Sequence, residues 1–427
     1  MTIRASTQKD IGNPKGFLRQ LFDRAVEVAD PMRSLASHLP DRPAGRVVVV
    51  GAGKASARMA LAVEAKWGAC EGLVITRYGY GCPCAGIEII EAAHPVPDQA
   101  GSVATERMLA LLDELGEGDF VLALISGGAS ALLVNACSGV SLTEKQAVYS
   151  ALLASGAPIG QINIVRKHLS RVKGGQLAAA SYPAQMLTLM ISDVPGDGPA
   201  FIGSGPTVGD STTPADACAV LSHWNISVSD NVTAALSQKN GLIAPGDIRL
   251  SKVENKIIAA PSQSIAAAAE TARSLGCDVK LLGDALEGEA RDFAARQAEL
   301  ALKIRASKKH GSRPLVLLSG GELTVTRSGN GIGGPNAEYC LALALALDGQ
   351  KGIYALACDT DGVDGGAEVA GAYVDPNTLL QAKKLGISAA DSLVNNDAHG
   401  FFESIDQQII TGPTLTNVND FRATLII

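Results

Sequence analysis

Residues 46–59 read Arg-Val-Val-Val-Val-Gly-Ala-Gly-Lys-Ala-Ser-Ala-Arg-Met, an apolar run that small residues interrupt and a helical pattern follows. Four consecutive valines suit a strand buried on both faces, as in a parallel sheet covered by helices. Gly51 and Gly53 let the backbone pass close to a ligand and leave amide N–H groups at a helix start, where the dipole favours an anion. Lys54 adds a positive charge there. The stretch therefore predicts a strand, a turn that binds phosphate or carboxylate, and a helix; a tight turn with a solvated lysine is the alternative.

The length and composition indicate two α/β domains. A chain of 427 residues exceeds what one core usually serves, and 47% hydrophobic content with 46 glycines is typical of an α/β protein with many tight turns. We expect the boundary near Asp247, with a new strand-helix-strand unit that begins at Lys256.

The charge and the apolar segments exclude several classes of protein. A formal net charge of −7 argues against a nucleic-acid surface. The first thirty residues lack a basic region followed by an apolar one, and no run of eighteen apolar residues occurs. We therefore expect a cytoplasmic protein that binds neither nucleic acid nor membranes. The eight cysteines are scattered as reduced thiols would be, and a zinc site at Cys82-Pro-Cys84 would need further ligands, of which only His94 lies within reach by sequence.

An amphipathic helix precedes the valine strand. Apolar residues recur at helical spacing from Phe17 to Ala29, and Pro31 ends the pattern. We expect this helix to pack on the first domain.

Two later strands end in segments that suit ligand binding. His94 follows the strand expected at 87–91, and ligands of α/β proteins bind beside the carboxyl ends of strands. A histidine that is hydrogen-bonded within a loop is an equally good interpretation. The strand expected at 120–125 opens onto Ser126-Gly127-Gly128-Ala129-Ser130, whose hydroxyls and amides predict a second anion-binding turn.

A further strand, expected at 186–191, ends in a turn that contains Asp193 and Asp197. The two carboxylates suit Mg²⁺, or one of them suits a general base. The alternative is a turn that uses its aspartates as caps.

Residues 163–175 form a basic segment that no acidic residue interrupts. On a helix, Arg166 and Lys173 lie two turns apart on one side, with Lys167 and Arg171 on an adjacent one. In an acidic protein this predicts an electrostatic clamp for a polyanion, and a solvated face is the alternative.

The second half of the chain uses a similar turn. A strand at 315–318 leads into Ser319-Gly320-Gly321-Glu322, which resembles the turn at Ser126. A glycine-rich loop then runs to Asn336 and precedes a helix. The aspartates within 358–365 suit Mg²⁺ or a substrate hydroxyl, but an EF-hand is excluded because Ala370 stands where its glutamate is needed.

Taken together, these segments resemble the motifs of one enzyme family over nearly the whole chain. The matching segments are 51–56 (GAGKAS), 94–98 (HPVPD), 126–133 (SGGASALL), 162–175 (INIVRKHLSRVKGG), 191–197 (ISDVPGD), 203–207 (GSGPT), 319–322 (SGGE), 333–336 (GGPN), 359–365 (DTDGVDG), 395–397 (NND) and 411–420 (TGPTLTNVND). Their series resembles the glycerate 2-kinase family of the MOFRL type, some members of which are named hydroxypyruvate reductase.

The resemblance implies a larger Rossmann-like N-terminal domain at residues 14–247, a smaller α/β domain at 253–427 with a MOFRL-type region at about 311–421, and an interdomain cleft. It also implies phosphorylation of D-glycerate at its 2-hydroxyl, with ATP and Mg²⁺ as cofactors and 2-phosphoglycerate as product. The partners would be glycerate and ATP, and the sequence leaves a homo-oligomer open.

Carried onto matching positions, the resemblance makes Lys54 the main phosphate-contacting cation and assigns the carboxylate or phosphate of the substrate to Arg166. Asp193 would be a metal ligand or the base, with Asp197 as a second Mg²⁺ ligand. The other residues that we expect to bind substrate or phosphate are Gly51, Gly53, Ser56, His94, Ser126, Gly127, Gly128, Ser130, Lys173, Gly320, Gly321, Glu322 and Asn336.

Two positions depart from the family pattern. Many relatives have an arginine where this chain has Pro335 and an aromatic residue where it has His399. The first change removes a cation, whose role is lost or passes to Arg166, Lys167 or Lys173.

Two other functions stay open. A reductase acting on hydroxypyruvate or tartronate semialdehyde with NAD(P)H would need a dinucleotide site, but Ser56 replaces the third glycine and Arg77 stands where an acidic residue is expected. A non-catalytic protein that binds a small acid is compatible with the fold alone. The preferred acid, glycerate, tartronate or a relative, is also open.

Overall fold

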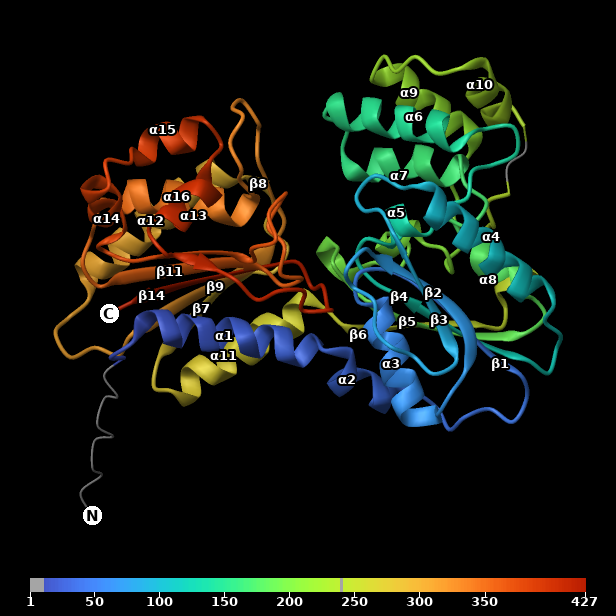
Figure 1. The fold of residues 1–427 in the computed structure, drawn as a ribbon, viewed down its shortest axis with the longest axis horizontal. Coiled ribbons are helices and arrows are strands. Elements are labelled where there is room, and N and C mark those ends of the chain that lie inside the picture. Colours follow the sequence, from blue (N-terminus) through green and yellow to red (C-terminus); the bar gives the residue numbers. More distant parts are fainter. Residues whose placement is uncertain (1–10, 239–240) are drawn as a thin grey trace. The chain divides into compact units, whose positions relative to one another are not determined.

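A computed structural model describes residues 11–238 and 241–427 of the chain and contains two compact units (Figure 1). One unit is Pro31–Ala259, which we call the parallel unit after its sheet. The other combines the described residues up to Asp30 with Ala260–Ile427, and we call it the mixed unit.

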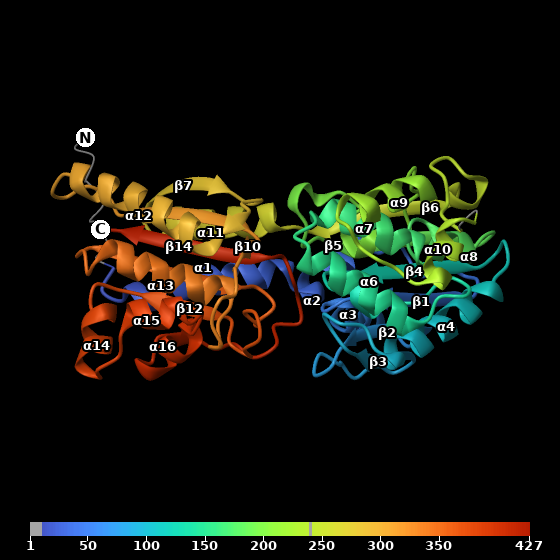
Figure 2. The ribbon, with the colours of Figure 1, turned by 90° about the horizontal axis from the view of Figure 1, so that it is seen from above.

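The parallel unit is built on a six-stranded sheet with the order β3-β2-β1-β4-β5-β6, in which all neighbours are parallel (Figure 2). The strands are β1 (Val47–Ala52), β2 (Glu71–Arg77), β3 (Ile87–Ala92), β4 (Phe120–Ile125), β5 (Gln185–Ile191) and β6 (Val253–Ala259). The four valines of β1 are at most 6% exposed because β1 lies between β2 and β4 and is covered on both faces. The predicted buried strand and parallel sheet are confirmed.

Helices cover this sheet and form a separate cluster beside it. They are α2 (Pro31–Ser34), α3 (Ser56–Trp67), α4 (Gln99–Asp113), α5 (Ala129–Leu132), α6 (Leu142–Ala154), α7 (Ile159–His168), α8 (Gln176–Ala180), α9 (Pro214–His223) and α10 (Asp230–Leu236). Short 3₁₀ turns lie at Leu35–His38, Pro195–Asp197, Ile202–Ser204 and Ile248–Leu250. The helices α6, α7, α9 and α10 bury a small apolar core of their own, which includes Val148, Ile162 and Val220.

The mixed unit contains a second six-stranded sheet, with the order β13-β12-β11-β14-β9-β7. Only the β7–β9 pair is parallel, and the other pairs are antiparallel. Its strands are β7 (Asp278–Gly283), β9 (Leu315–Gly321), β11 (Ile353–Asp359), β12 (Gly371–Val374), β13 (Gln408–Ile409) and β14 (Asp420–Ile426), and the pair β8 (Gly288–Glu289) and β10 (Leu323–Thr324) forms a small parallel sheet.

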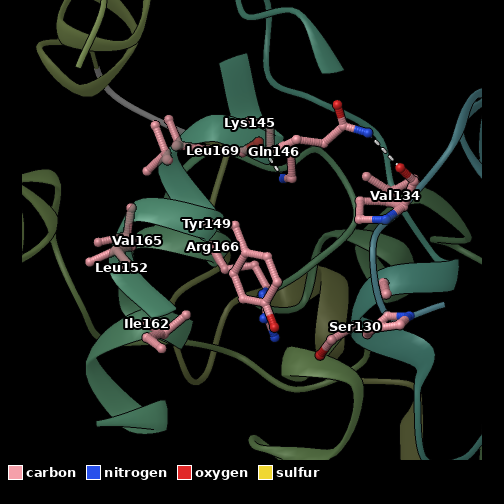
Figure 3. Close-up of a pocket in the computed structure, with 14 residues that line it drawn as sticks. Ser130, Val134, Lys145, Gln146, Tyr149, Leu152, Ile162, Val165, Arg166 and Leu169 are labelled. Carbon is pink, nitrogen blue, oxygen red and sulfur yellow. Dashed lines mark hydrogen bonds between the residues drawn. The ribbon is translucent and has the colours of Figure 1, made fainter. Parts of the chain in front are cut away.

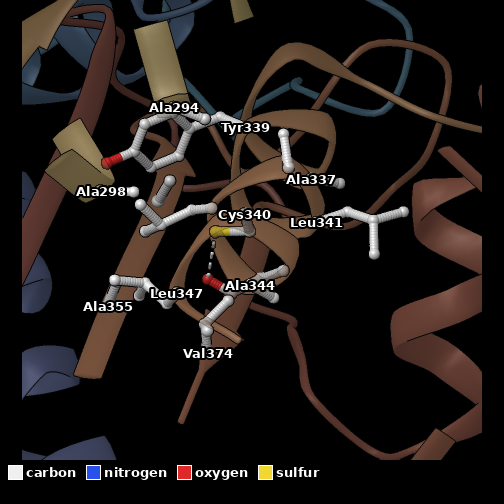
Figure 4. Packing of buried hydrophobic residues seen from close by; sticks show 14 of the residues in the cluster. Ala294, Ala298, Ala337, Tyr339, Cys340, Leu341, Ala344, Leu347, Ala355 and Val374 are labelled. Carbon is white, nitrogen blue, oxygen red and sulfur yellow. Dashed lines mark hydrogen bonds between the residues drawn. The ribbon is translucent and has the colours of Figure 1, made fainter. Parts of the chain in front are cut away.

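Helices sandwich the mixed sheet (Figure 1). Those of this unit are α1 (Pro14–Ala29), α11 (Pro261–Ser274), α12 (Ala290–Ser307), α13 (Pro335–Leu347), α14 (Thr378–Lys384), α15 (Ala389–Val394) and α16 (Ala398–Ser404). On one face, α12 and α13 pack together with Ala298, Cys340 and Val374 in the same core (Figure 4). The other face is covered by α1 and α11.

We expected the helix α1 to pack on the first domain. It belongs instead to the mixed unit. Its buried residues Leu18, Leu21 and Phe22 share a core with α11 and with residues of β9, β11 and β14. The periodicity correctly predicts an apolar face on this helix, but it carries no information about which sheet covers that face.

The strand at Lys256 also differs from the expectation. It lies in β6, which pairs with β5 as the edge strand of the parallel sheet, so the second unit begins with α11 and not with this strand. Among the described residues, no helix has both the length and the apolar character that crossing a membrane requires.

Candidate active site

The turn between β1 and α3 is closed by its own backbone. The amides of Gly53, Lys54 and Ser56 each donate to a backbone carbonyl of the unit at 2.8–3.1 Å. The amide of Ala55 donates to Ser126 Oγ at 3.0 Å. The prediction that this turn leaves free amides is therefore wrong, because the neighbouring strand ends take them up.

Ser126 joins this turn to the one that follows β4. Its buried Oγ lies 3.1 Å from Ser56 Oγ, which also contacts the Leu124 carbonyl at 3.0 Å. A Cβ at Gly53, where φ is +139°, would overlap Ser126, and one at Gly51 would overlap Leu124. These predicted ligand-binding residues therefore hold the two turns together.

The second turn provides the open amides. Within the described part of the chain, the amides of Gly127 and Gly128 donate to no protein acceptor. A Cβ at Gly128, where φ is +84°, would lie 3.1 Å from the His94 ring and 3.3 Å from Lys54 Cγ. The structure thus brings together Lys54, His94 and two bare amides at the carboxyl ends of neighbouring strands, which we call the cradle. Such backbone amides form a concave site for an anion.

A hydrogen-bonded chain links Ser130 to Arg166. Ser130 Oγ lies 2.7 Å from Ser204 Oγ, which donates to Asn163 Oδ1 at 3.1 Å. Arg166 Nη1 donates to the same Asn163 oxygen at 3.0 Å. The sequence predicted the two ends of this hydrogen-bonded chain, Ser130 and Arg166, but not Asn163 and Ser204 between them. Asn163 lies within the motif 162–175 and Ser204 lies within the motif 203–207. Their place in these motifs was the only signal in the sequence for either residue.

The basic segment does not form the surface clamp that we expected. The helix α7 ends at His168, so Lys173 is not on it. Lys167 Nζ lies 2.6 Å from Asp210 in a buried ion pair. Lys173 is completely buried and donates to the Leu133 carbonyl at 3.0 Å, and burial lowers the pKa of Lys173 well below its usual value. Of these cations, Arg166 lines the cavity between α6 and α7, and the exposed Arg171 lines a separate surface pocket.

The turn after β5 places Asp193 and Asp197 at the carboxyl end of the parallel sheet. Asp197 Oδ1 is buried and, among the described residues, has no hydrogen-bond partner. No group of three or more His, Cys, Asp or Glu side chains in the described chain could hold a metal by itself. Mg²⁺ is usually held by one or two carboxylates together with water and phosphate oxygens, so the pair fits this ion.

In the mixed unit, the start of α13 is already capped by a carboxylate. Asp364 accepts the amides of Asn336 and Ala337 at 2.9 and 2.8 Å. The buried Asn336 side chain donates to Asp364 and to Asp420, at 3.2 and 2.7 Å. The residue Asn336, which we expected to bind substrate, is therefore part of a buried polar network.

The turn at 319–322 has the opposite polarity to the cradle. The carbonyls of Gly320 and Gly321 accept from Arg422 Nη2 at 2.7 and 3.2 Å, and Arg422 Nη1 lies 2.9 Å from Asp420 Oδ2. Glu322 is exposed. The turns at 126–128 and 319–321 have the same Ser-Gly-Gly sequence but do not form similar sites. In the turn at 319–321 the carbonyls, and not the amides, face a charged group.

The two departures from the family pattern lie beside this network. Pro335 is the first residue of α13, where its ring and missing N–H suit a helix start. His399 is buried, and its Nε2 lies 3.1 Å from Asp364 Oδ2. His399 thus adds a polar contact to the residue that caps α13.

The fold and the cradle define a two-unit α/β protein that presents two open amides beside a lysine and a histidine at the end of a parallel sheet. The model of a family described as "Domain of unknown function (DUF4147)" matches residues 17–237, and that of the MOFRL family matches residues 315–420. The chain is 39% identical to the D-glycerate 2-kinase of Thermotoga maritima over 96% of this chain and 97% of that protein. This chain belongs to the same two-domain glycerate kinase family.

Other relatives carry a second name. A protein of Agrobacterium vitis named "Putative hydroxypyruvate reductase" is 49% identical to this chain, and the match covers 96% of this chain and 94% of that protein.

The crystal structure of a glycerate kinase from Thermotoga maritima superposes with a TM-score of 0.84 at 38% identity, over 96% of this chain and 99% of that one.

Proposed function

We propose that this protein is a glycerate 2-kinase, which transfers the γ-phosphate of ATP to the 2-hydroxyl of D-glycerate. The observation that carries the proposal is the cradle, in which the Lys54 stem and the His94 ring lie against Gly128 beside two bare amides. Phosphoryl transfer requires positioning and neutralisation of charge more than covalent help from the protein. A cation beside open amides supplies both.

The order of the strands supports a nucleotide site at the same place. The order 3-2-1-4-5-6 is that of Rossmann-like folds, in which ligands bind where the chain direction of the crossovers reverses, between β1 and β4. The cradle follows these two strands. Lys54 would contact the transferred phosphate there, and the Gly127 and Gly128 amides would donate hydrogen bonds to its oxygens.

Mg²⁺ would be held by Asp193 and Asp197, and it would neutralise charge on the nucleotide phosphates. The unsatisfied Asp197 oxygen supports this choice. Asp193 stays the candidate for the base if it does not bind the metal. The interdomain cleft that the resemblance implies stays a prediction, as do the homo-oligomer and a cytoplasmic location.

The second candidate is a reductase for hydroxypyruvate, and the name of the Agrobacterium vitis relative favours it. The structure gives two observations against it. Ser56, at the position of the third fingerprint glycine, contacts Leu124 and Ser126, and β2 ends at Arg77 and not at an acidic residue. A kinase therefore accounts for the site better.

The test is an assay with purified protein. D-Glycerate, ATP and Mg²⁺ are supplied in one reaction, and hydroxypyruvate with NADH or NADPH in another. We expect ADP and 2-phosphoglycerate in the first reaction and no oxidation of the nicotinamide in the second. Nicotinamide oxidation without ADP would show that the reductase is correct. Acid binding without either reaction would leave the non-catalytic alternative.

A further inference from the structure

A small cavity lies between α6 and α7 beside the cradle (Figure 3). Its wall is mostly apolar, with Val134, Leu152 and Ile162 among its residues, and its polar groups come from few side chains. Arg166 and Tyr149 lie against each other and extend toward Ser130 (Figure 3). The cavity volume of about 30 Å³ matches a group the size of about two water molecules. A carboxylate is of this size and a nucleotide is not.

Two basic side chains and no acidic one line the cavity. Lys145 is 7% exposed, and its Nζ donates to the Leu169 carbonyl at 2.6 Å. The Arg166 guanidinium lies 4.4 Å from the centre of the Tyr149 ring and contacts Asn163. Within the described residues neither Lys145 nor Arg166 forms an ion pair with a carboxylate. Buried cations are normally paired, so this arrangement is costly unless an anion binds.

The cavity and the cradle share one turn. Ser130 lines the cavity and lies two residues after Gly128, and it is linked to Arg166 through Ser204 and Asn163. An acid held at Ser130 and Arg166 is therefore next to the amides proposed to hold the phosphate. The two sites would bind the two ends of one small molecule in the reaction.

We propose that this cavity is the subsite for the carboxylate of the acceptor acid, with Arg166 and Ser130 as its contacts and Lys145 as a second cation that the substrate neutralises. This inference rests on the proposed kinase function for the identity of the acid. It adds Lys145 and Tyr149, which lie outside the segments that carry the family resemblance. It predicts selection for small 2-hydroxy acids over their neutral analogues. Tyr149 and Asn163 are positioning residues, because they hold Arg166.

The test uses Lys145→Met and Arg166→Met, with Arg171→Met as the matched control because Arg171 is exposed on the same basic segment. In the full-length protein we expect KM for D-glycerate to rise roughly ten- to hundredfold in the first two variants, since a hydrogen bond to a charged group is lost. KM for ATP should stay within about twofold. Methyl glycerate has no charge, so the wild type should bind it more weakly than glycerate, with a higher KM. In Lys145→Met and Arg166→Met the two KM values should become similar.

A binding measurement without nucleotide separates this inference from the kinase proposal. D-Glycerate should raise the melting temperature of the wild type and of Arg171→Met, but not that of Lys145→Met, and inorganic phosphate should not reproduce the effect. Methionine fills the Lys145 site without charge, so this variant is expected to melt at a higher temperature than the wild type when no acid is present.

The outcomes are distinct. Unchanged acid KM and an unchanged glycerate shift in folded Lys145→Met and Arg166→Met would overturn the subsite and leave the kinase standing. Lost binding of ATP or phosphate, with acid binding intact, would also overturn it. If ADP never forms but acid binding depends on both cations, the subsite stands and the kinase proposal fails. If Arg166→Met does not fold, Lys145→Met decides alone.

Discussion

The structure places Lys54 at the candidate site, as the sequence predicts, but for a different physical reason. Its own amide is taken up by the fold, while its side chain lies against Gly128 beside the amides of another turn. We predict that Lys54→Ala lowers kcat by about 10²- to 10³-fold, the usual effect of removing one group that stabilises transition-state charge. Steady-state kinetics with ATP and D-glycerate measure this.

The control for that variant is Lys66→Ala, which removes an exposed lysine from the last turn of α3. It should keep wild-type turnover and melting temperature. Lys54→Ala should also keep the melting temperature, because Lys54 is not part of the core. Full turnover in Lys54→Ala would remove this residue from the site.

Lys145 should make stability depend on pH. Burial lowers the pKa of this lysine to about 7, against a smaller opposite effect from Cys137 and with a still smaller lowering from Arg166 on α7. The unfolded chain keeps the lysine protonated up to about pH 10.5, its ordinary value. Below pH 7 the folded protein therefore bears the full cost of a buried charge. As pH rises through 7 that cost is relieved.

We predict that Lys145→Met is more stable than the wild type at pH 6 and that the difference in unfolding free energy shrinks between pH 7 and 9. Urea denaturation at several pH values, without acid, measures it. Arg171→Met should show no such pH-dependent difference. A difference that grows with pH would contradict the argument.

At the scale of elements, the turn after β4 carries the site because one glycine allows close contact. Gly128 has φ +84°, and a Cβ there would lie 3.1 Å from the His94 ring and 3.3 Å from Lys54 Cγ, whereas Gly139 has φ +81° and no atom within 4 Å of its Cβ position. We predict that alanine at either position costs about 1 to 2 kcal/mol of stability, because both adopt a left-handed conformation. Only Gly128→Ala should also lower turnover.

Thermal denaturation and kinetics of the two alanine variants test this pair. The comparison separates backbone strain, which they share, from crowding of the cradle, which only Gly128 has. Equal losses of turnover would show that strain alone explains the effect and that the cradle is not the site.

The basic segment around α7 serves the fold as well as the site. Burial raises the pKa of Asp210, but the hydrogen bonds from Lys167 and Thr212 outweigh it and hold the pKa below its usual range. We predict that Lys167→Met costs about 3 to 5 kcal/mol because it leaves the Asp210 charge buried and unpaired. Adding Asp210→Asn should recover part of the loss in urea denaturation. No recovery in the double variant would mean that the pair does not explain the cost.

At the scale of the whole molecule, α1 shows that sequence order and unit membership differ. Leu21 is fully buried in the core that α1 shares with α11 and β14. We predict that Leu21→Ala destabilises the mixed unit by about 2 to 5 kcal/mol. Hydrogen exchange should then show faster exchange in β9 and β14, with β1 and β4 still protected. Loss of protection in β1 instead would place α1 on the parallel unit.

Local patterns in the sequence were enough to predict the elements of the site. The valine run, the two glycine turns and the strand ends at His94 and Asp193 all depend on the propensities of near neighbours, which the sequence states directly. The parallel sheet and the helix of residues 17–29 follow from periodicity in the same way. The family also follows, since its motifs run along nearly the whole chain.

What the sequence by itself determined is therefore the buried strand β1, the turns that follow β1 and β4, and the family to which the chain belongs. Only the tertiary structure decided which of those turns keeps open amides, that Lys173 is buried rather than presented, and that α1 and β6 belong to other units than expected. The reason is physical. The role of an amide, a lysine or an apolar face depends on the group that it hydrogen-bonds or packs against. Segments distant in the sequence, such as Ser126, Leu133 and α11, supply those partners.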